Sequence, residues 1–228
     1  KHCYWSTHVM CSAEMTVCLQ AFILICFIVY CAESSAPSPS LQRNKYNNSF
    51  HLTRSTRTRV QQLLRKYKKQ QLGDEDFEDR SRQLKDLPSL STDFYSWLKM
   101  TDLERLHAAF LDMQAYWNML EWKRRQLEKE EKEQLVVQAP QTTLPQSIKH
   151  VQLDLRDLMR QVSSQMTYVK SSVTKPVTAP VLTLLKLESS SKTVWDSRVE
   201  GYIILRDLDL YLTKLARDFL LLASKTHS

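Results

Sequence analysis

One pair of residues has the types and the spacing of a catalytic metal site. Glu104 and His107 form a Glu-x-x-His sequence, the spacing that di-iron helical bundles use. Such a site needs a second copy of this sequence and two further inward glutamates, and the chain contains only this copy. Leu106 belongs to the apolar face of a predicted helix, so Glu104 and His107 are expected to flank that face. We therefore predict no metal site and no cofactor.

Other catalytic signatures are absent from the sequence. The two glycines, Gly73 and Gly201, are too few for a glycine-rich phosphate loop or a dinucleotide fingerprint. The chain has neither a Gly-x-Ser-x-Gly nor a His-Glu-x-x-His sequence, and its remaining histidines are scattered. We predict that the protein is not an enzyme.

A second pair, Trp195 and Arg198, opens the last predicted helix, which runs from Val194 to Ala223. The apolar residues that follow recur at spacings of three and four, so they form one face of that helix. They are Leu205, Leu208, Leu212, Leu215, Phe219 and Leu222. Trp195 precedes this face. A tryptophan beside a cation is either part of the core or part of a protein contact surface, where this pairing is enriched.

The charge of the chain favours anionic partners. Its net charge is +7, which fits a heparan-sulfate-like polyanion or an acidic receptor surface. Nucleic acid would also fit the charge, but no nucleic-acid-binding motif is present, so we do not predict that partner. A run of basic residues along the first predicted helix is either a solvated face or a polyanion-binding face.

The N-terminal residues predict secretion. All five cysteines lie in residues 1–31, and Val17 to Tyr30 is almost continuously apolar, a length typical of a signal peptide. We expect a signal peptide over 1–31 with cleavage near 31–36, a flexible mature N-terminus over 32–49 and no membrane insertion after cleavage. The alternative is an uncleaved signal anchor. In a secreted chain, Asn47 lies in a glycosylation sequon, Asn47-Asn48-Ser49.

Hydrophobic periodicity predicts four helices within residues 50–225. The first covers Phe50–Leu72, the third Gln146–Ser171 and the fourth Val194–Ala223. The second begins at the Thr101–Glu104 capping box and continues towards Pro140. The links at 74–100 and 174–192 are long, and the link at 139–145 is short. This order predicts an all-α, long-chain four-helix bundle with up-up-down-down topology and two long crossover connections. In the first link, Phe77, Leu84, Leu87, Phe94, Tyr95 and Trp97 are expected to anchor the chain.

The opening of the fourth helix, Trp195 to Leu205, resembles that of the interleukin-6 family of helical cytokines. The similar branch contains ciliary neurotrophic factor, cardiotrophin and the cardiotrophin-like cytokine. Trp195 and Arg198 take the places of a Phe-x-x-Lys pair, and Gly201 takes the place of a glycine. The first helix and its turn (Leu52-Thr53-Arg54, Gln62 to Tyr67, Gly73, Asp76-Phe77) and the segment Leu103 to Trp117 also resemble this branch.

The resemblance implies a secreted cytokine, with growth-factor activity in immune responses, that assembles cell-surface receptor ectodomains. The implied receptors are the shared signal-transducing glycoprotein receptor and a leukaemia-inhibitory-factor-type receptor, with JAK/STAT signalling inside the cell. Trp195 and Arg198 would form the third receptor site, and the end of the fourth helix with Lys214 the first, where Leu220 replaces a basic residue. The second site would use Gln62, Lys66, Lys69, Arg156, Asp157 and Arg160. The alternative is a membrane-tethered or intracellular helical scaffold.

Overall fold

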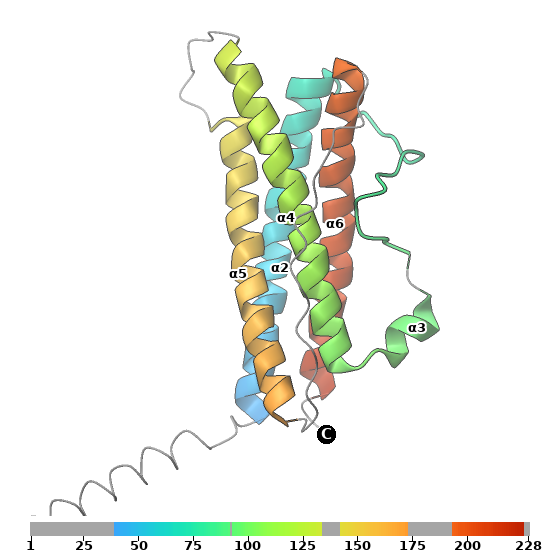
Figure 1. The fold of residues 1–228 in the computed structure, drawn as a ribbon, viewed down its shortest axis with the longest axis vertical. Helices are drawn as coiled ribbons and strands as arrows, with labels where there is room; N and C mark the ends of the chain where they lie inside the picture. Colours follow the sequence, from blue (N-terminus) through green and yellow to red (C-terminus); the bar gives the residue numbers. More distant parts are fainter. Residues whose placement is uncertain (1–38, 92, 134–141, 173–192, 226–228) are drawn as a thin grey trace, which may run out of the picture. The chain divides into compact units, whose positions relative to one another are not determined.

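The computed structural model describes residues 39–91, 93–133, 142–172 and 193–225, and all regular structure within them is helical (Figure 1). The elements are α2 (Pro39–Tyr67), the one-turn π-helix η1 (Lys68–Leu72), α3 (Phe94–Lys99), α4 (Asp102–Glu133), α5 (Leu144–Ser172) and α6 (Val194–Lys225). The all-α prediction is confirmed for these residues. The predicted signal peptide, residues 1–31, and the predicted second crossover, residues 174–192, lie outside them. No described helix combines the length and the apolarity needed to cross a membrane.

The first long helix begins at Pro39 rather than at Phe50, so residues 39–49 are helical and the predicted flexible segment is corrected there. Proline is favoured at the first position of a helix. The segment packs through the buried ring of Tyr46 and through polar side chains. Ser49 Oγ donates to Gln161 Oε1 at 2.6 Å and accepts from Gln165 Nε2 at 2.8 Å. We call these three residues and their contacts the polar seam between α2 and α5. A prediction based on the spacing of apolar residues does not detect this seam, because its residues are polar.

Four long helices pack side by side (Figure 1), with α2 and α4 each in contact with α5 and α6. Near the end of α2, the Tyr67 hydroxyl donates to the Arg198 carbonyl oxygen at 3.0 Å, close to the start of α6. In the middle of α2, Arg57 pairs with Asp209, further along α6, at 2.9 Å. These two helices therefore run in opposite directions.

The contacts between α2 and α5 give the same result. Lys66, near the end of α2, donates to the carbonyl oxygen of Thr142, just before α5. Arg59, about two helical turns before Lys66, pairs with Asp154 inside α5. The α2 helix therefore runs opposite to α5 as well.

The predicted boundaries of the last three helices and the predicted apolar face of α6 are close to those observed. All six residues of the predicted α6 face, Leu205 to Leu222, are buried. At the start of α4 the Thr101 amide donates to Glu104 Oε2 at 2.8 Å, and the Glu104 amide donates to Thr101 Oγ1 at 3.3 Å. The predicted capping box is therefore confirmed. Gly73 ends η1 at φ 73°, a left-handed conformation that favours glycine.

A buried ion pair attaches the end of the first long connection to the bundle. Arg105 is 2% exposed, and its Nη1 donates to Asp218 Oδ1 at 2.5 Å. Its Nη2 donates to the Trp97 carbonyl oxygen at 2.6 Å, while Trp97 Nε1 donates to the same Asp218 oxygen at 2.7 Å. The guanidinium carbon also lies 4.7 Å from the centre of the Trp97 ring. This Trp97–Arg105–Asp218 network joins α3, α4 and α6.

The other predicted anchors of this connection divide into two groups. Phe77, Leu84 and Leu87 are partly buried and pack against the core, as predicted. Phe94 and Tyr95 do not, because they are 62% and 70% exposed on the short helix α3. Trp97 supplies the polar attachment that holds α3, so its two aromatic neighbours are left at the surface.

We expect Asp218→Leu to lower the free energy of unfolding by about 3–5 kcal/mol, because it leaves the Arg105 guanidinium buried without its carboxylate. The double variant Arg105→Met/Asp218→Leu should recover most of that loss, since it removes both charges. Denaturant unfolding at neutral pH measures both values.

Lys225→Met is the matched control, because it breaks an exposed ion pair, Lys225 with Asp102 at 2.6 Å, between the same two helices. Its cost should stay below about 1 kcal/mol. A double variant as unstable as Asp218→Leu alone would contradict the assignment of the cost to the unpaired guanidinium.

Candidate functional site

The start of α6 presents a partly exposed tryptophan on a support of two other aromatic rings. Trp195 is 46% exposed. The edge of its ring meets Phe77, from the first long connection, at a centroid distance of 6.0 Å, and Phe77 meets the buried Tyr202 at 5.0 Å. Trp195 is therefore a surface residue held by a packed neighbour, rather than a core residue.

The helix start itself is fixed by a capping arrangement. The Asp196 amide donates to Thr193 Oγ1 at 3.0 Å, and Thr193 Oγ1 donates to Asp196 Oδ2 at 2.7 Å. Arg82, from the first connection, pairs with the same aspartate: its Nη1 lies 3.4 Å from Asp196 Oδ1. Because a capped first turn does not fray, Trp195 within that turn has a defined position.

Arg198 lies one turn further into the helix and is half-buried. Its carbonyl oxygen accepts the Tyr67 hydroxyl, so its backbone is joined to the end of α2. Its Nε atom is buried and has no hydrogen-bond partner among the described residues. Arg105 Nε is likewise buried and unpaired, so the two arginines differ instead in that the Arg105 guanidinium has a carboxylate partner, Asp218.

Gly201 permits the close approach of two side chains beneath this part of α6. A Cβ atom added to Gly201 would lie 2.2 Å from the Tyr67 hydroxyl oxygen and 2.5 Å from Lys123 Cε. Lys123 comes from α4, is 2% exposed and donates from Nζ to the Ser197 carbonyl oxygen and to Gln126 Oε1, both at 2.9 Å. Gly201 therefore lies at the point where side chains of α2 and α4 pack against α6.

Burial lowers the pKa of Lys123 to about 8, and the nearby carboxylates of Glu130 and Glu200 act in the opposite direction. Desolvation disfavours the ammonium form, and the hydrogen bonds to Ser197 and Gln126 do not fully replace its hydration. This lysine consequently titrates closer to neutral pH than an exposed lysine, directly beneath the turn that carries Trp195 and Arg198.

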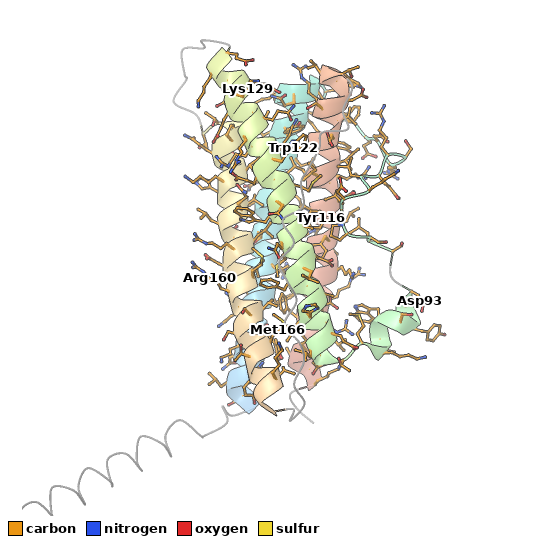
Figure 2. The ribbon with its side chains drawn as sticks, viewed as in Figure 1. Asp93, Tyr116, Trp122, Lys129, Arg160 and Met166 are labelled. Carbon is orange, nitrogen blue, oxygen red and sulfur yellow. The ribbon has the colours of Figure 1, made fainter. Side chains whose placement is uncertain are left out.

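The residues predicted for a second contact site do not all come together. Arg156 and Arg160 are exposed on α5 and both contact Asp157, at 3.5 and 3.4 Å (Arg160 is labelled in Figure 2). Lys66 instead contacts Thr142, before the start of α5. The rise of an α-helix puts that point roughly 20–27 Å along the axis from the two arginines. Lys66 and the Arg156–Arg160 surface are therefore separate.

Lys214 lies half-buried on α6 beside a hollow that α3 helps to line, with Phe94, Trp97 and Arg217 among the lining residues. Burial raises the pKa of the neighbouring Asp112 to about 6, and the Lys214 charge partly opposes this shift. Phe94 of α3 and the end of α6 thus border one surface. Leu220, 48% exposed, lies one turn beyond Arg217 on that helix.

Two other predicted sites have simple local structures. Asn47 is half-buried on α2, and Ser49 of its sequon is fully buried in the polar seam, while glycosylation stays a prediction. The Glu104 carboxylate accepts hydrogen bonds from Thr101 in the capping box. Within the described ranges, no three or more His, Cys, Asp or Glu side chains gather as metal ligands would.

Sequence reasoning missed the support beneath the site. Lys123 stands at spacings of three and four from Leu120 and Leu127, on the buried side of α4, where the pattern calls for an apolar residue. The sequence did contain a signal for this contact: a lysine at an apolar position of one helix, Lys123, and a glycine inside another, Gly201. Phe77 was expected only to anchor its connection, and its contact with Trp195 was not foreseen.

The chain was compared with known protein families and with curated proteins. No protein-family model matches the chain, and no curated protein matches it in sequence.

The stability of the wild type should rise relative to that of Lys123→Met between about pH 7 and about pH 9.5, by on the order of 1–2 kcal/mol. The folded-state pKa of Lys123 is about 8, below its ordinary value of 10.5. Above pH 8 the unfolded chain therefore holds the proton that the folded chain releases, and stability increases with pH. Denaturant unfolding of both proteins at the two pH values gives the difference. An exposed control, Lys129→Met, should show no such change, and parallel stabilities of wild type and Lys123→Met would contradict the prediction.

Proposed function

We propose that the protein is a secreted cytokine that assembles cell-surface cytokine receptors. The proposed receptors are the shared signal-transducing glycoprotein receptor and a leukaemia-inhibitory-factor-type receptor, whose association triggers JAK/STAT signalling. The observation that carries this proposal is the 46% exposure of Trp195 at the capped start of α6, where Phe77 supports its ring. A large aromatic that is already held in place loses little conformational freedom on binding, and tryptophans dominate the binding energy of many protein interfaces.

The proposed topology is the up-up-down-down order with two long crossover connections. The opposite directions of α2 relative to α5 and α6 support it. The spacing of the elements along the chain also supports it. Residues 73–101 separate η1 from α4, whereas only residues 134–143 separate α4 from α5. A long connection can return to the starting end of a bundle, and a short one joins antiparallel neighbours.

The proposed mechanism is binding without covalent chemistry. Trp195 would enter an apolar depression on one receptor, and Arg198 would pair with a carboxylate or carbonyl group beside it. Arg156 and Arg160, exposed on α5, would contribute a second receptor surface. Lys214, with the exposed aromatic rings of α3, would contribute a third. The geometry of the bundle would then set which receptor chains meet.

The alternative function is that of a membrane-tethered or intracellular helical scaffold. The fate of the apolar segment Val17 to Tyr30 separates the two functions. Sequencing the N-terminus of protein recovered from the culture medium should give a start between Ala32 and Pro37 if the protein is a secreted cytokine. Recovery of the whole chain in the membrane fraction alone would favour the scaffold.

The double variant Trp195→Ala/Arg198→Ala should raise the concentration needed for half-maximal STAT phosphorylation by about 100-fold or more, because it removes an aromatic anchor and its neighbouring cation. Binding to the shared signal-transducing receptor, measured with its purified ectodomain, should be unchanged. The circular dichroism spectrum should also be unchanged.

The matched control is Leu111→Ala/Arg125→Ala, which removes an exposed apolar side chain and an exposed arginine from α4. Its signalling should equal that of the wild type. Full signalling by the Trp195/Arg198 variant would overturn the assignment of this site.

A further inference from the structure

The first helical segment is unusual in its charge. Residues 39–72, which form α2 and η1, contain nine Lys or Arg residues and no Asp or Glu. Because the whole chain has a net charge of +7, the remainder of the chain is slightly acidic. The positive charge of the protein is therefore concentrated on one helix.

Neighbouring elements neutralise some of these cations and leave others without a carboxylate partner among the described residues. Arg57 pairs with Asp209, Arg59 with Asp154 and Lys69 with Glu75. Three further arginines, Arg43, Arg54 and Arg65, are exposed and pair with no carboxylate of the described residues. Their charges are consequently available to a partner.

The spacing of these three arginines places them on one line. They follow one another at intervals of eleven residues. Eleven residues are close to three full helical turns, so the side chains point the same way with a rotation of only about 20° per step. The helical rise separates them by about 16 Å each. The exposed residues between them on this face, such as Thr58 and Gln62, are uncharged. We call Arg43, Arg54 and Arg65 the arginine stripe.

We propose that the arginine stripe binds a linear sulfated polysaccharide. A straight row of guanidinium groups fits an extended polymer with repeated sulfate and carboxylate groups, each of which can accept two parallel hydrogen bonds from one arginine. The proposal goes beyond receptor assembly, since it concerns another surface and does not depend on Trp195.

The side chains around the stripe favour a polysaccharide over other polyanions. Binding of single-stranded nucleic acid uses exposed aromatic rings on which bases stack, and the tyrosines of α2, Tyr46 and Tyr67, are buried. Phe50 is half-buried with the Arg54 guanidinium 5.7 Å above its ring, so that face is already occupied. Binding to an anionic bilayer uses large apolar residues beside the cations, and Leu41 is the one large apolar residue of α2 that is exposed.

The test compares two triple variants of the purified full chain on immobilised heparin. Arg43→Gln/Arg54→Gln/Arg65→Gln removes the stripe. Arg80→Gln/Arg125→Gln/Arg160→Gln removes three other exposed arginines, each of which pairs with a neighbouring carboxylate. Both variants lose three charges, so non-specific attraction falls equally in both. Thermal melting checks that each variant is folded.

We expect the stripe variant to elute at clearly lower salt than the wild type and the control variant to elute close to the wild type. The slope of log affinity against log salt should fall by about 2 to 3 for the stripe variant, because three counterion-releasing contacts are lost. Equal losses in the two variants would overturn the proposal. Stripe-dependent binding of a single-stranded oligonucleotide or of phosphatidylserine vesicles, as strong as that of heparin, would overturn the choice of a polysaccharide. Signalling by the stripe variant on cells tests receptor assembly separately.

Discussion

The arrangement of the bundle depends on two cations that α4 buries against α6. Arg105 and Lys123 are eighteen residues apart, which is five helical turns, so both side chains lie on the same side of α4. A buried charge needs a nearby acceptor, and the two acceptors lie near opposite ends of α6: the Asp218 carboxylate and the Ser197 carbonyl oxygen. Sliding α4 by one turn along α6 would separate both cations from these two acceptors. Apolar side chains alone would tolerate such a slip far better.

Each of these cations also organises a part of the surface. Arg105 and Asp218 hold Trp97 and therefore the short helix α3, whose Phe94 and Tyr95 remain exposed. Lys123 lies beneath Gly201 and hydrogen-bonds the turn that carries Trp195 and Arg198. The two candidate contact surfaces of α6 are thus built over the two buried charges. Replacement of either cation is expected to affect the surface above it as well as stability.

The sequence predicted those parts of the fold that rest on apolar periodicity and local capping. The buried face of α6 and the Thr101–Glu104 capping box are visible in the order of residue types alone. The first half of α2 is not, because Ser49 packs there through hydrogen bonds to Gln161 and Gln165, and such residues are equally typical of loops. At the candidate site, the resemblance selected Trp195 and Arg198 but not Phe77. Lys66 was grouped with Arg156 because helix positions were inferred without the offset between α2 and α5, which the contacts of Lys66 and Arg59 reveal.

The polar seam gives one end of the bundle a different response to temperature. Exposing polar groups on unfolding lowers the heat-capacity change, whereas exposing apolar groups raises it. Ser49, Thr53, Thr56 and Gln165 are buried around the α2–α5 seam, whereas the buried residues of α6 are mostly apolar. Unfolding the seam therefore contributes little to the curvature of stability with temperature, and most of that curvature arises from α6 and the helices packed on it. Cooling weakens the apolar part of the bundle while the hydrogen-bonded junction between α2 and α5 keeps its strength.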